Sequence, residues 1–499
     1  MSSPVIFPFK SNINLDRKSN RHLYLQLCDQ MIGFIKSGKL APSTKLPGSR
    51  KLSDDLAIHR KTVVSAYDEL ISQGWIESIP AKGTFVSQDL PIIKPKKLQD
   101  SSILLEAKDT AGFTFKKRRH LIRKGIETIQ ATLKVDDGVP DHRLAPIDDI
   151  AKIYRNITKK AHHKKLLIYG DIYGNIELRK ALVTYLNQTR GLKINIDNVL
   201  ITRGSQMGIY LASQLLLNNK KIIITGNTNY MTADNTFIEA DGIIKRVAVD
   251  KQGLDTNEIE KVCKKNQISA VYVTSHHHHP TTVTLSAERR MHLLDLAQQY
   301  NFAIIEDDYD YDFHYNNAPI LPLACNDSQG NVIYIGGFTK IIAPALRVGY
   351  FIAPKEVVDE AARLRRILDR QGDTLLEQTL ARMIQNGDVQ RHSNKVRRIY
   401  KTRRDLFCQL LMEKLTDFFE FEIPKGGMAF WVKLKKPYHW DLVMVASQKQ
   451  NLTFINDWRR YDNDNSGHNG FRMGFAALNE EEIEEVVEKL VRAMNSIKT

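Results

Sequence analysis

Apolar residues recur at helical spacing near the start of the chain. Leu27, Met31 and Ile35 lie four positions apart within residues 22–37 and predict an amphipathic helix that stops at Gly38. This is the first of several periodic segments in the N-terminal quarter.

Two further helices are predicted next. Residues 49–56 predict a short helix with Ser49 as its N-cap. A three-residue turn then leads into a third helix over residues 60–71. The apolar stripe of the third helix leaves Arg60 and Thr62 near its exposed N-terminal end. Helix-turn-helix proteins read the major groove of DNA with that part of their second helix.

A β-hairpin is predicted after these helices. Residues 74–78 and 83–87 alternate between apolar and polar positions, and Lys82 and Gly83 lie at the tip between them. Such a hairpin beside a helix-turn-helix is a wing. Residues 89–130 then read as a basic linker, because Pro91, Pro95 and clustered lysines discourage a packed fold. Within it residues 118–130 can form a basic helix that either stays solvated or touches DNA.

From Val135 onward short apolar runs alternate with amphipathic helices. This alternation favours a largely parallel sheet that is covered on both faces and binds its ligand at the carboxyl ends of the strands. The predicted strands are residues 199–202, 221–225, 270–274, 303–306 and 332–335.

Composition agrees with two or more domains and with a polyanionic partner. The chain has 499 residues, 42% of them hydrophobic and 26% charged, and its net charge is +15. Residues 1–130 hold 22 Lys and Arg against 12 Asp and Glu, which leaves +10 in the first quarter. A merely solvated basic surface is the alternative.

Cysteine usage and hydropathy favour a cytoplasmic protein. The four cysteines are scattered without paired spacing, so reduced thiols are expected rather than disulfides or a zinc site. No apolar run approaches the roughly 18 residues of a membrane span, and the first residues lack a signal-peptide core.

Lys340 is the strongest candidate for chemistry. It follows a strand-like run, with Thr339 beside it and Arg347 seven residues further on. A lysine in this setting can form a Schiff base with an aldehyde whose phosphate the hydroxyl and guanidinium bind. These groups indicate pyridoxal phosphate (PLP) as the cofactor.

Other polar side chains follow the predicted strands. Asp307, expected just after a strand, can pair with a protonated pyridine nitrogen, and Tyr309 can reach the cofactor's phenolate oxygen. Ser205 lies in a segment expected to open a helix over residues 208–217, so its hydroxyl and the nearby amides are aimed at an anion. Tyr230 can stack on a ring. Residues 306–308 could instead bind Mg²⁺, but no phosphotransfer motif accompanies them.

The run of four histidines at residues 276–279 raises the possibility of a metal site. Neighbouring side chains on a strand alternate between faces and cannot all converge on one ion, so no metal is expected.

The first domain resembles the winged helix-turn-helix of GntR-type regulators. The likeness runs from Leu46-Pro47-Gly48-Ser49-Arg50 to Thr84-Phe85-Val86, with Gly48 and His59 where the family commonly has serine. His59 is a poorer helix cap than serine, which implies a softer helix start. By this resemblance the DNA contacts would be Ser49, Arg50, Arg60, Thr62, Lys82 and Gly83.

Residues 135–499 resemble fold-type I, class I/II aminotransferases. The motifs are Gly138-Val139-Pro140-Asp141, Tyr169 to Gly174 and Phe471 to Phe475, together with the residues already named. The whole order resembles the MocR subfamily of GntR-type regulators. It implies an α/β chain made of a winged helix-turn-helix (1–88), the linker (89–130) and a PLP-binding domain (131–499) with a mostly parallel sheet and a smaller C-terminal α+β part.

The resemblance also implies roles for individual residues. Lys340 would carry the Schiff base, Asp307 would hold the pyridine nitrogen, and Arg472 would grip an amino acid's carboxylate with its planar fork. The remaining cofactor contacts would come from Tyr169 of the neighbouring subunit, Ser205, Gln206, Tyr230, His279, Tyr309, Thr339 and Arg347.

Two departures from the aminotransferase pattern bear on catalysis. His279 stands where asparagine commonly faces the cofactor phenolate, and Gly337 stands where a hydroxyl residue is frequent. Cofactor binding is expected to survive both changes, whereas efficient transamination is not, because proton transfer needs tight geometry.

The resulting hypothesis is a PLP-dependent transcriptional regulator. It would be a head-to-tail homodimer that binds operator DNA and senses PLP, an amino compound, or both. One alternative is a working aminotransferase with an accessory DNA-binding domain, and another is a regulator whose second domain has lost the cofactor and only dimerises.

Overall fold

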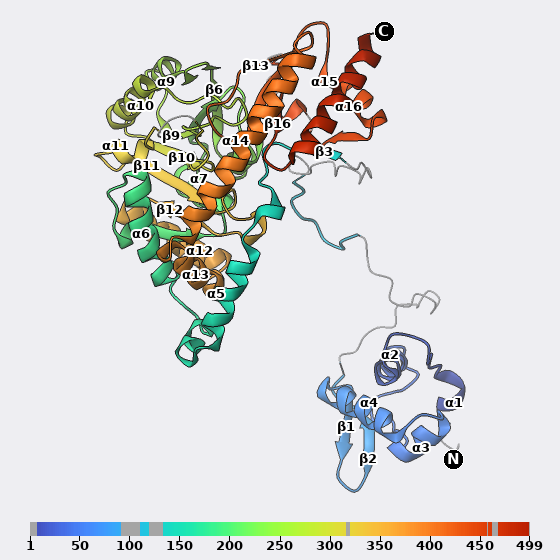
Figure 1. The fold of residues 1–499 in the computed structure, drawn as a ribbon. Coiled ribbons are helices and arrows are strands. Elements are labelled where there is room, and N and C mark those ends of the chain that lie inside the picture. Colours follow the sequence, from blue (N-terminus) through green and yellow to red (C-terminus); the bar gives the residue numbers. More distant parts are fainter. Residues whose placement is uncertain are drawn as a thin grey trace. The chain divides into compact units, whose positions relative to one another are not determined.

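The structure is a computed structural model that describes residues 7–90, 110–118, 133–315, 320–456, 458–461 and 468–498. The chain divides into two compact units, Met1–Lys117 and Arg118–Thr499 (Figure 1). Most of the expected linker over residues 89–130, and the basic helix expected within it apart from Arg118, lies outside the described residues.

The first unit is a small helical bundle with a two-stranded wing. Its antiparallel hairpin pairs Ile76 with Val86. Apolar residues from the three longer helices and from both strands form one core. Leu27, Val63 and Leu70 are fully buried in it. The elements are α1 (Phe9–Asn12), α2 (Leu23–Lys36), α3 (Ser49–Asp55), α4 (Arg60–Ser72), β1 (Ile76–Ile79) and β2 (Gly83–Val86).

One of the two helix starts of the helix-turn-helix differs from expectation. Gly48, not Ser49, is the N-cap of α3, so Ser49 is already helical and its hydroxyl is left to other partners. His59 does cap α4, because its Nδ1 accepts a hydrogen bond from the backbone N–H of Lys61 at 3.2 Å. The Tyr67 hydroxyl donates to the Pro47 carbonyl at 2.7 Å and ties α4 to the turn before α3.

The second unit is built on a seven-stranded sheet in the order β4-β12-β11-β10-β9-β5-β6. Only β12 runs antiparallel to its neighbours, so the mostly parallel sheet is confirmed. The strands are β4 (Val199–Thr202), β5 (Ile222–Gly226), β6 (Ile243–Val247), β9 (Ile268–Val273), β10 (Ala303–Asp308), β11 (Val332–Gly337) and β12 (Gly349–Ile352).

Helices cover both faces of this sheet (Figure 1). On one face the buried strand residues pack with α6 (Ile176–Arg190), α9 (Thr256–Cys263), α10 (Ala287–Tyr300) and α13 (Thr374–Gln385). On the other face they pack with α7 (Ser205–Leu216), α8 (Met231–Glu239) and α12 (Lys355–Leu368). The burial of both faces explains why the strands read as continuous apolar runs.

A smaller sheet, β13-β14-β16, forms the C-terminal part with its own core. The parallel pair β3-β15 brings the start of this unit beside its end. The elements are β3 (Leu133–Val135), β13 (Phe419–Phe421), β14 (Ala429–Leu434), β15 (Leu452–Phe454), β16 (Gly470–Gly474), α14 (Asp388–Lys414), α15 (Trp440–Lys449) and α16 (Glu480–Lys498).

The remaining elements are short or peripheral. They are α5 (Ile147–Lys159), α11 (Leu323–Asn326), β7 (Val249–Asp250) and β8 (Gly253–Leu254). Of the helices in the described residues, none has the length and apolar character needed to cross a bilayer.

Gly349 on β12 packs closely against two backbone segments, at Gly204 after β4 and at Gly336 on β11. A Cβ atom at this position would lie 2.7 Å from the carbonyl carbon of Gly204 and 2.8 Å from the oxygen of Gly336. Since backbone atoms cannot swing aside, Gly349→Ala should lower the free energy of unfolding by ~1–3 kcal/mol. Urea denaturation followed by tryptophan fluorescence measures the change.

Gly170→Ala is the matched control, because its added carbon would make contacts no closer than 3.7 Å. Equal stabilities of the two variants would contradict the close packing of β12 on the loop that carries Gly204.

Candidate functional site

A cavity of about 210 Å³ lies at the carboxyl ends of the central strands of the second unit. Its walls come from the strand ends and from the start of α7. The lining residues are Asp137, Ser205, Gln206, Tyr230, Tyr272, Thr274, His279, Asp307, Tyr309, Gly337, Thr339, Lys340, Arg347 and Arg472.

The structure therefore brings together nearly all of the predicted cofactor and effector residues. The exception is Tyr169, whose side chain is 73% exposed and stacks under the Arg370 guanidinium at 4.0 Å. Its predicted role belongs to a neighbouring subunit and stays a prediction.

Lys340 lies in the turn that follows β11. Its Nζ donates to the Gly138 carbonyl at 2.6 Å. Burial lowers the pKa of Lys340, although the nearby Asp137 carboxylate opposes this shift. A lowered pKa increases the share of neutral amine, which is the nucleophilic form that attacks an aldehyde.

Asp307 points into the cavity because β10 alternates its side chains. The strand runs on to Asp308, so Asp307 lies within it and not after it as expected. Ile305, two residues earlier, packs on the α7 face, and Asp307 shares that face. The Tyr272 hydroxyl donates to its Oδ2 at 2.8 Å. Burial nevertheless raises the pKa of Asp307 to about 7.

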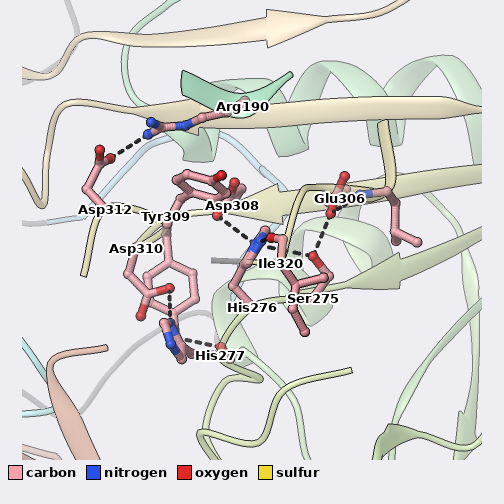
Figure 2. A network of polar contacts seen from close by, with 12 residues as sticks. Arg190, Ser275, His276, His277, Glu306, Asp308, Tyr309, Asp310, Asp312 and Ile320 are labelled. Carbon is pink, nitrogen blue, oxygen red and sulfur yellow. Dashed lines mark hydrogen bonds and ion pairs between the residues drawn. The ribbon is translucent and has the colours of Figure 1, made fainter. Parts of the chain in front are cut away.

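The two acidic neighbours of Asp307 face the opposite side of the sheet, where each has protein partners (Figure 2). Glu306 accepts hydrogen bonds from the Ser275 hydroxyl and from the amides of Leu323 and Ala324. Asp308 pairs with His276. The acidic run is therefore split by strand geometry and does not form one carboxylate cluster.

The start of α7 forms the anion-binding corner of the cavity. The helix begins at Ser205, three residues earlier than predicted, with Gly204 as its N-cap at φ 76°. The Gln206 Nε2 donates to the Thr236 hydroxyl at 2.8 Å. The Arg347 guanidinium lies so close over Gly204 that a Cβ there would be 2.8 Å from its Nη2. Backbone amides, a hydroxyl and a guanidinium thus converge, which suits a phosphate.

His279 forms the wall beside Tyr230, whose ring it meets edge-on at 5.1 Å between centroids. Burial, reinforced by the Arg472 charge, holds the pKa of His279 well below its usual value, so the imidazole is neutral. A neutral imidazole retains one N–H donor and one acceptor nitrogen.

Arg472 lies on β16 and is 1% exposed. Its fork is engaged by backbone and side-chain oxygens: Nε donates to the Asp137 carbonyl (2.9 Å), Nη1 to the Pro280 carbonyl (3.1 Å) and Nη2 to the Tyr309 hydroxyl (3.2 Å). The Tyr309 hydroxyl in turn donates to the His277 carbonyl at 2.8 Å. The guanidinium is thereby fixed at the cavity wall.

The other three histidines of the run point to separate partners, as Figure 2 shows for two of them. His276 contacts Asp308, His277 contacts Asp310 at 2.8 Å, and His278 contacts the Thr281 hydroxyl at 2.8 Å. Within the described ranges no three His, Cys, Asp or Glu side chains gather as metal ligands would.

Three buried polar atoms of the cavity residues have no hydrogen-bond partner in the described part of the chain. They are Gln206 Oε1, His279 Nδ1 and Asp307 Oδ1. Unsatisfied buried atoms are costly, and their gathering around one cavity indicates a polar ligand. A phosphorylated pyridine aldehyde fits the set, since the α7 corner suits its phosphate and Asp307 its ring nitrogen.

Sequence reasoning missed three of the lining residues, Asp137, Tyr272 and Thr274. Tyr272 and Thr274 lie at the end of β9, next to β10, and this adjacency was the available signal because parallel strand ends meet at one edge. Asp137 comes from the segment after β3, and nothing in its local pattern indicates that it returns to the cavity.

In the first unit all the predicted DNA contacts are at least partly accessible. Arg50, Arg60, Lys82 and Gly83 are exposed, and Ser49 and Thr62 are half-buried. The Arg60 Nε donates to the Ser49 hydroxyl at 3.3 Å, so the starts of α3 and α4 lie side by side. Neither Arg60 nor Lys82 forms an ion pair with a carboxylate among the described residues of this unit.

Comparison with known proteins agrees with this architecture. Residues 138–496 match the family model for aminotransferase class I and II, and residues 23–86 match that for bacterial regulatory proteins of the gntR family. The probable rhizopine catabolism regulatory protein MocR of Rhizobium meliloti is 24% identical over 97% of this chain and 96% of its own length.

Aminotransferases match about three quarters of the chain. Aromatic-amino-acid aminotransferase 1 of Thermococcus litoralis is 26% identical over 75% of this chain and 91% of its own length. The structure of Pyrococcus horikoshii kynurenine aminotransferase, solved with PMP, superposes with a TM-score of 0.71 at 24% identity, covering 77% of this chain and 98% of that one.

The fold and site define a fold-type I, PLP-binding α/β protein. The chain belongs to the aminotransferase class I and II family and carries a gntR-type helix-turn-helix before it. The MocR-like order predicted from the motifs is confirmed.

Asp307 makes the stability of the cofactor-free protein depend on pH. Its folded pKa of about 7 lies above the ordinary 3.8, so the folded state binds the proton more tightly. Its contribution to stability is fully present below about pH 4 and is lost as pH rises through about 7, by on the order of 4 kcal/mol.

The measurement compares urea unfolding of wild type and Asp307→Asn between pH 4 and 8. The wild type should lose stability relative to the variant across this window, and PLP should reduce the loss by supplying a cation. Parallel curves for the two proteins would show that Asp307 does not titrate there.

Proposed function

We propose that this chain is a PLP-dependent transcriptional regulator that reports the state of its aminotransferase-like cavity to a DNA-binding winged helix. The observation that supports it most is the gathering of three unsatisfied polar atoms around Lys340 in a chain that also carries a helix-turn-helix. Its place of action is the cytoplasm, where its DNA is.

Each part of the cofactor has a matching group in the cavity. Ser205, Thr339 and Arg347 suit the phosphate, and Asp307 suits the ring nitrogen. His279 replaces the usual asparagine as donor to the ring oxygen, since its unpartnered Nδ1 is buried there. When bound, PLP supplies an aldehyde that bonds covalently to a primary amine and a ring that withdraws electrons.

The protein's own residues then sense an amino compound. Arg472 is the anchor for a carboxylate, because its guanidinium is dry and held from three sides. To affect transcription, the ligand must bind more tightly to one arrangement of a dimer than to another, since equal affinity shifts nothing. The head-to-tail dimer, with Tyr169 reaching the partner's cofactor, is part of this proposal.

The alternative of a working aminotransferase with an accessory DNA-binding domain has less support. The regulatory protein of Rhizobium meliloti matches 97% of this chain, whereas the aminotransferase of Thermococcus litoralis matches 75% of it. Repeated amino transfer between a donor and an acceptor at a rate that exceeds one slow half reaction would favour that alternative.

Lys340→Ala tests whether PLP binds covalently to this lysine. Wild type mixed with PLP should show a yellow chromophore, and borohydride should trap the cofactor on Lys340, whereas the variant should show neither because it has no amine at that place. Lys159→Ala removes an exposed lysine on α5 and should behave as wild type. A variant that kept the chromophore would refute the assignment of Lys340.

Arg60→Ala and Lys82→Ala test DNA binding by the first unit. Arg60 at the start of α4 is positioned to reach base edges, so its loss should cost about 1–3 kcal/mol and relax sequence preference. Lys82 at the wing tip should contact phosphates, so its loss should weaken binding evenly across sequences and reduce the salt dependence. Fluorescence anisotropy with a fragment of the gene's own promoter and a scrambled one measures both. Unchanged affinity of Arg60→Ala would contradict the placement of the recognition helix.

A further inference from the structure

One carboxylate inside the cavity has no role in holding the cofactor. Asp137 lines the cavity and is half-buried. Its side chain makes no hydrogen bond or ion pair with any residue in the part of the chain that the structure describes. The other acid of the cavity, Asp307, is committed to Tyr272 and to the ring nitrogen.

The backbone that carries Asp137 is fixed by the two groups that would meet an effector. The Asp137 carbonyl accepts from Arg472 Nε at 2.9 Å, and the Gly138 carbonyl accepts from Lys340 Nζ at 2.6 Å. The Asp136 carboxylate accepts hydrogen bonds from the amides of Gly138 and Val139 at 2.7 and 3.0 Å. The backbone at Asp137 is therefore held by both the amine and the guanidinium, and its side chain lines the cavity beside them.

The Asp137 charge acts on two cations of the cavity, because it raises the pKa of both Lys340 and Arg472. Among the charges that act on the pKa of Lys340, Asp137 is the strongest that raises it. While the lysine amine holds the cofactor, that cation is withdrawn from Asp137, and it would return only when an effector's α-amine takes the lysine's place and releases it. A carboxylate left in a partly dry cavity is costly unless another cation replaces the lost one.

We propose that Asp137 selects the effector, and that the cavity takes an amino acid with a second cationic group, its carboxylate at Arg472 and its second ammonium at Asp137. This inference rests on the proposed function and names the ligand class of the same site. Asp137 is thus a specificity-determining residue and takes no part in cofactor binding.

Other ligand classes fit this arrangement less well. A second carboxylate would face Asp137 and be repelled, and an apolar side chain would bury the carboxylate without a partner. Arg460, another cation on this side, is not among the lining residues and donates to Asn456 Oδ1.

The test is a titration of the full-length, PLP-loaded protein with three amino acids of similar size. Ornithine carries the second ammonium, norvaline has the same carbon chain without it, and glutamate carries a carboxylate instead. Binding is followed by the cofactor's absorbance and, independently, by the shift in melting temperature. Wild type should prefer ornithine to norvaline by about tenfold or more, since a desolvated charge pair of ~1.4 kcal/mol gives that ratio.

Asp137→Asn keeps the shape of the side chain and removes its charge. In this variant the preference should fall to within about twofold, because ornithine binding weakens, and glutamate should bind better than it does to wild type. Asp148→Asn is the control, since it removes one exposed carboxylate of the same unit on α5. It should keep the wild-type preference.

The possible outcomes distinguish a failure of this inference from a failure of the proposed PLP-dependent function. A wild type that stays yellow but shows no preference for ornithine, or binds none of the three, overturns the role of Asp137 and leaves the cofactor assignment standing. An Asp137→Asn variant that weakens ornithine and norvaline equally overturns it too, because the residue would then only position Lys340. A colourless wild type overturns the proposed function and this inference together.

Discussion

The buried carboxylate of Asp307 is the constraint on which the site depends. An ionised carboxylate inside a protein must be paired, protonated or given hydrogen bonds. Tyr272 satisfies one oxygen, the other has no partner in the described residues, and burial raises the pKa of Asp307 to about 7. A protonated ring nitrogen would pair with this carboxylate. The unpartnered Oδ1 of Asp307 is therefore the most direct structural sign of the cofactor.

Strand geometry places this carboxylate and keeps its neighbours away. Because side chains alternate along β10, Glu306 and Asp308 turn to the other face, where amides, Ser275 and His276 satisfy them (Figure 2). The four consecutive histidines lie in the bend and turn after β9, where His276, His277 and His278 each contact a different partner. A compact acidic run in a sequence is thus divided by a strand into groups with unrelated surroundings.

The segment just after β3 connects the sensing groups to the rest of the chain. Its carbonyls hold both Lys340 and Arg472, and in the sequence it follows directly on the linker region. A ligand that engages either side chain competes for these hydrogen bonds. By this competition, binding in the cavity can change the free energy of one conformation relative to another, as allosteric coupling requires.

The sequence by itself determined the two-part organisation, the strand and helix order and most of the cavity residues. Hydrophobic periodicity records which face of each element is buried, and small polar turns at strand ends are local features, so Lys340, Ser205 and Arg347 could be identified without coordinates. Only the tertiary structure decided that Asp307 lies inside β10, that α7 begins at Ser205 and that Gly48 precedes α3 as its cap. It also decided the place of Asp137, about two hundred residues from Lys340, because a contact over that separation depends on how β3 packs beside β15 and not on any local pattern.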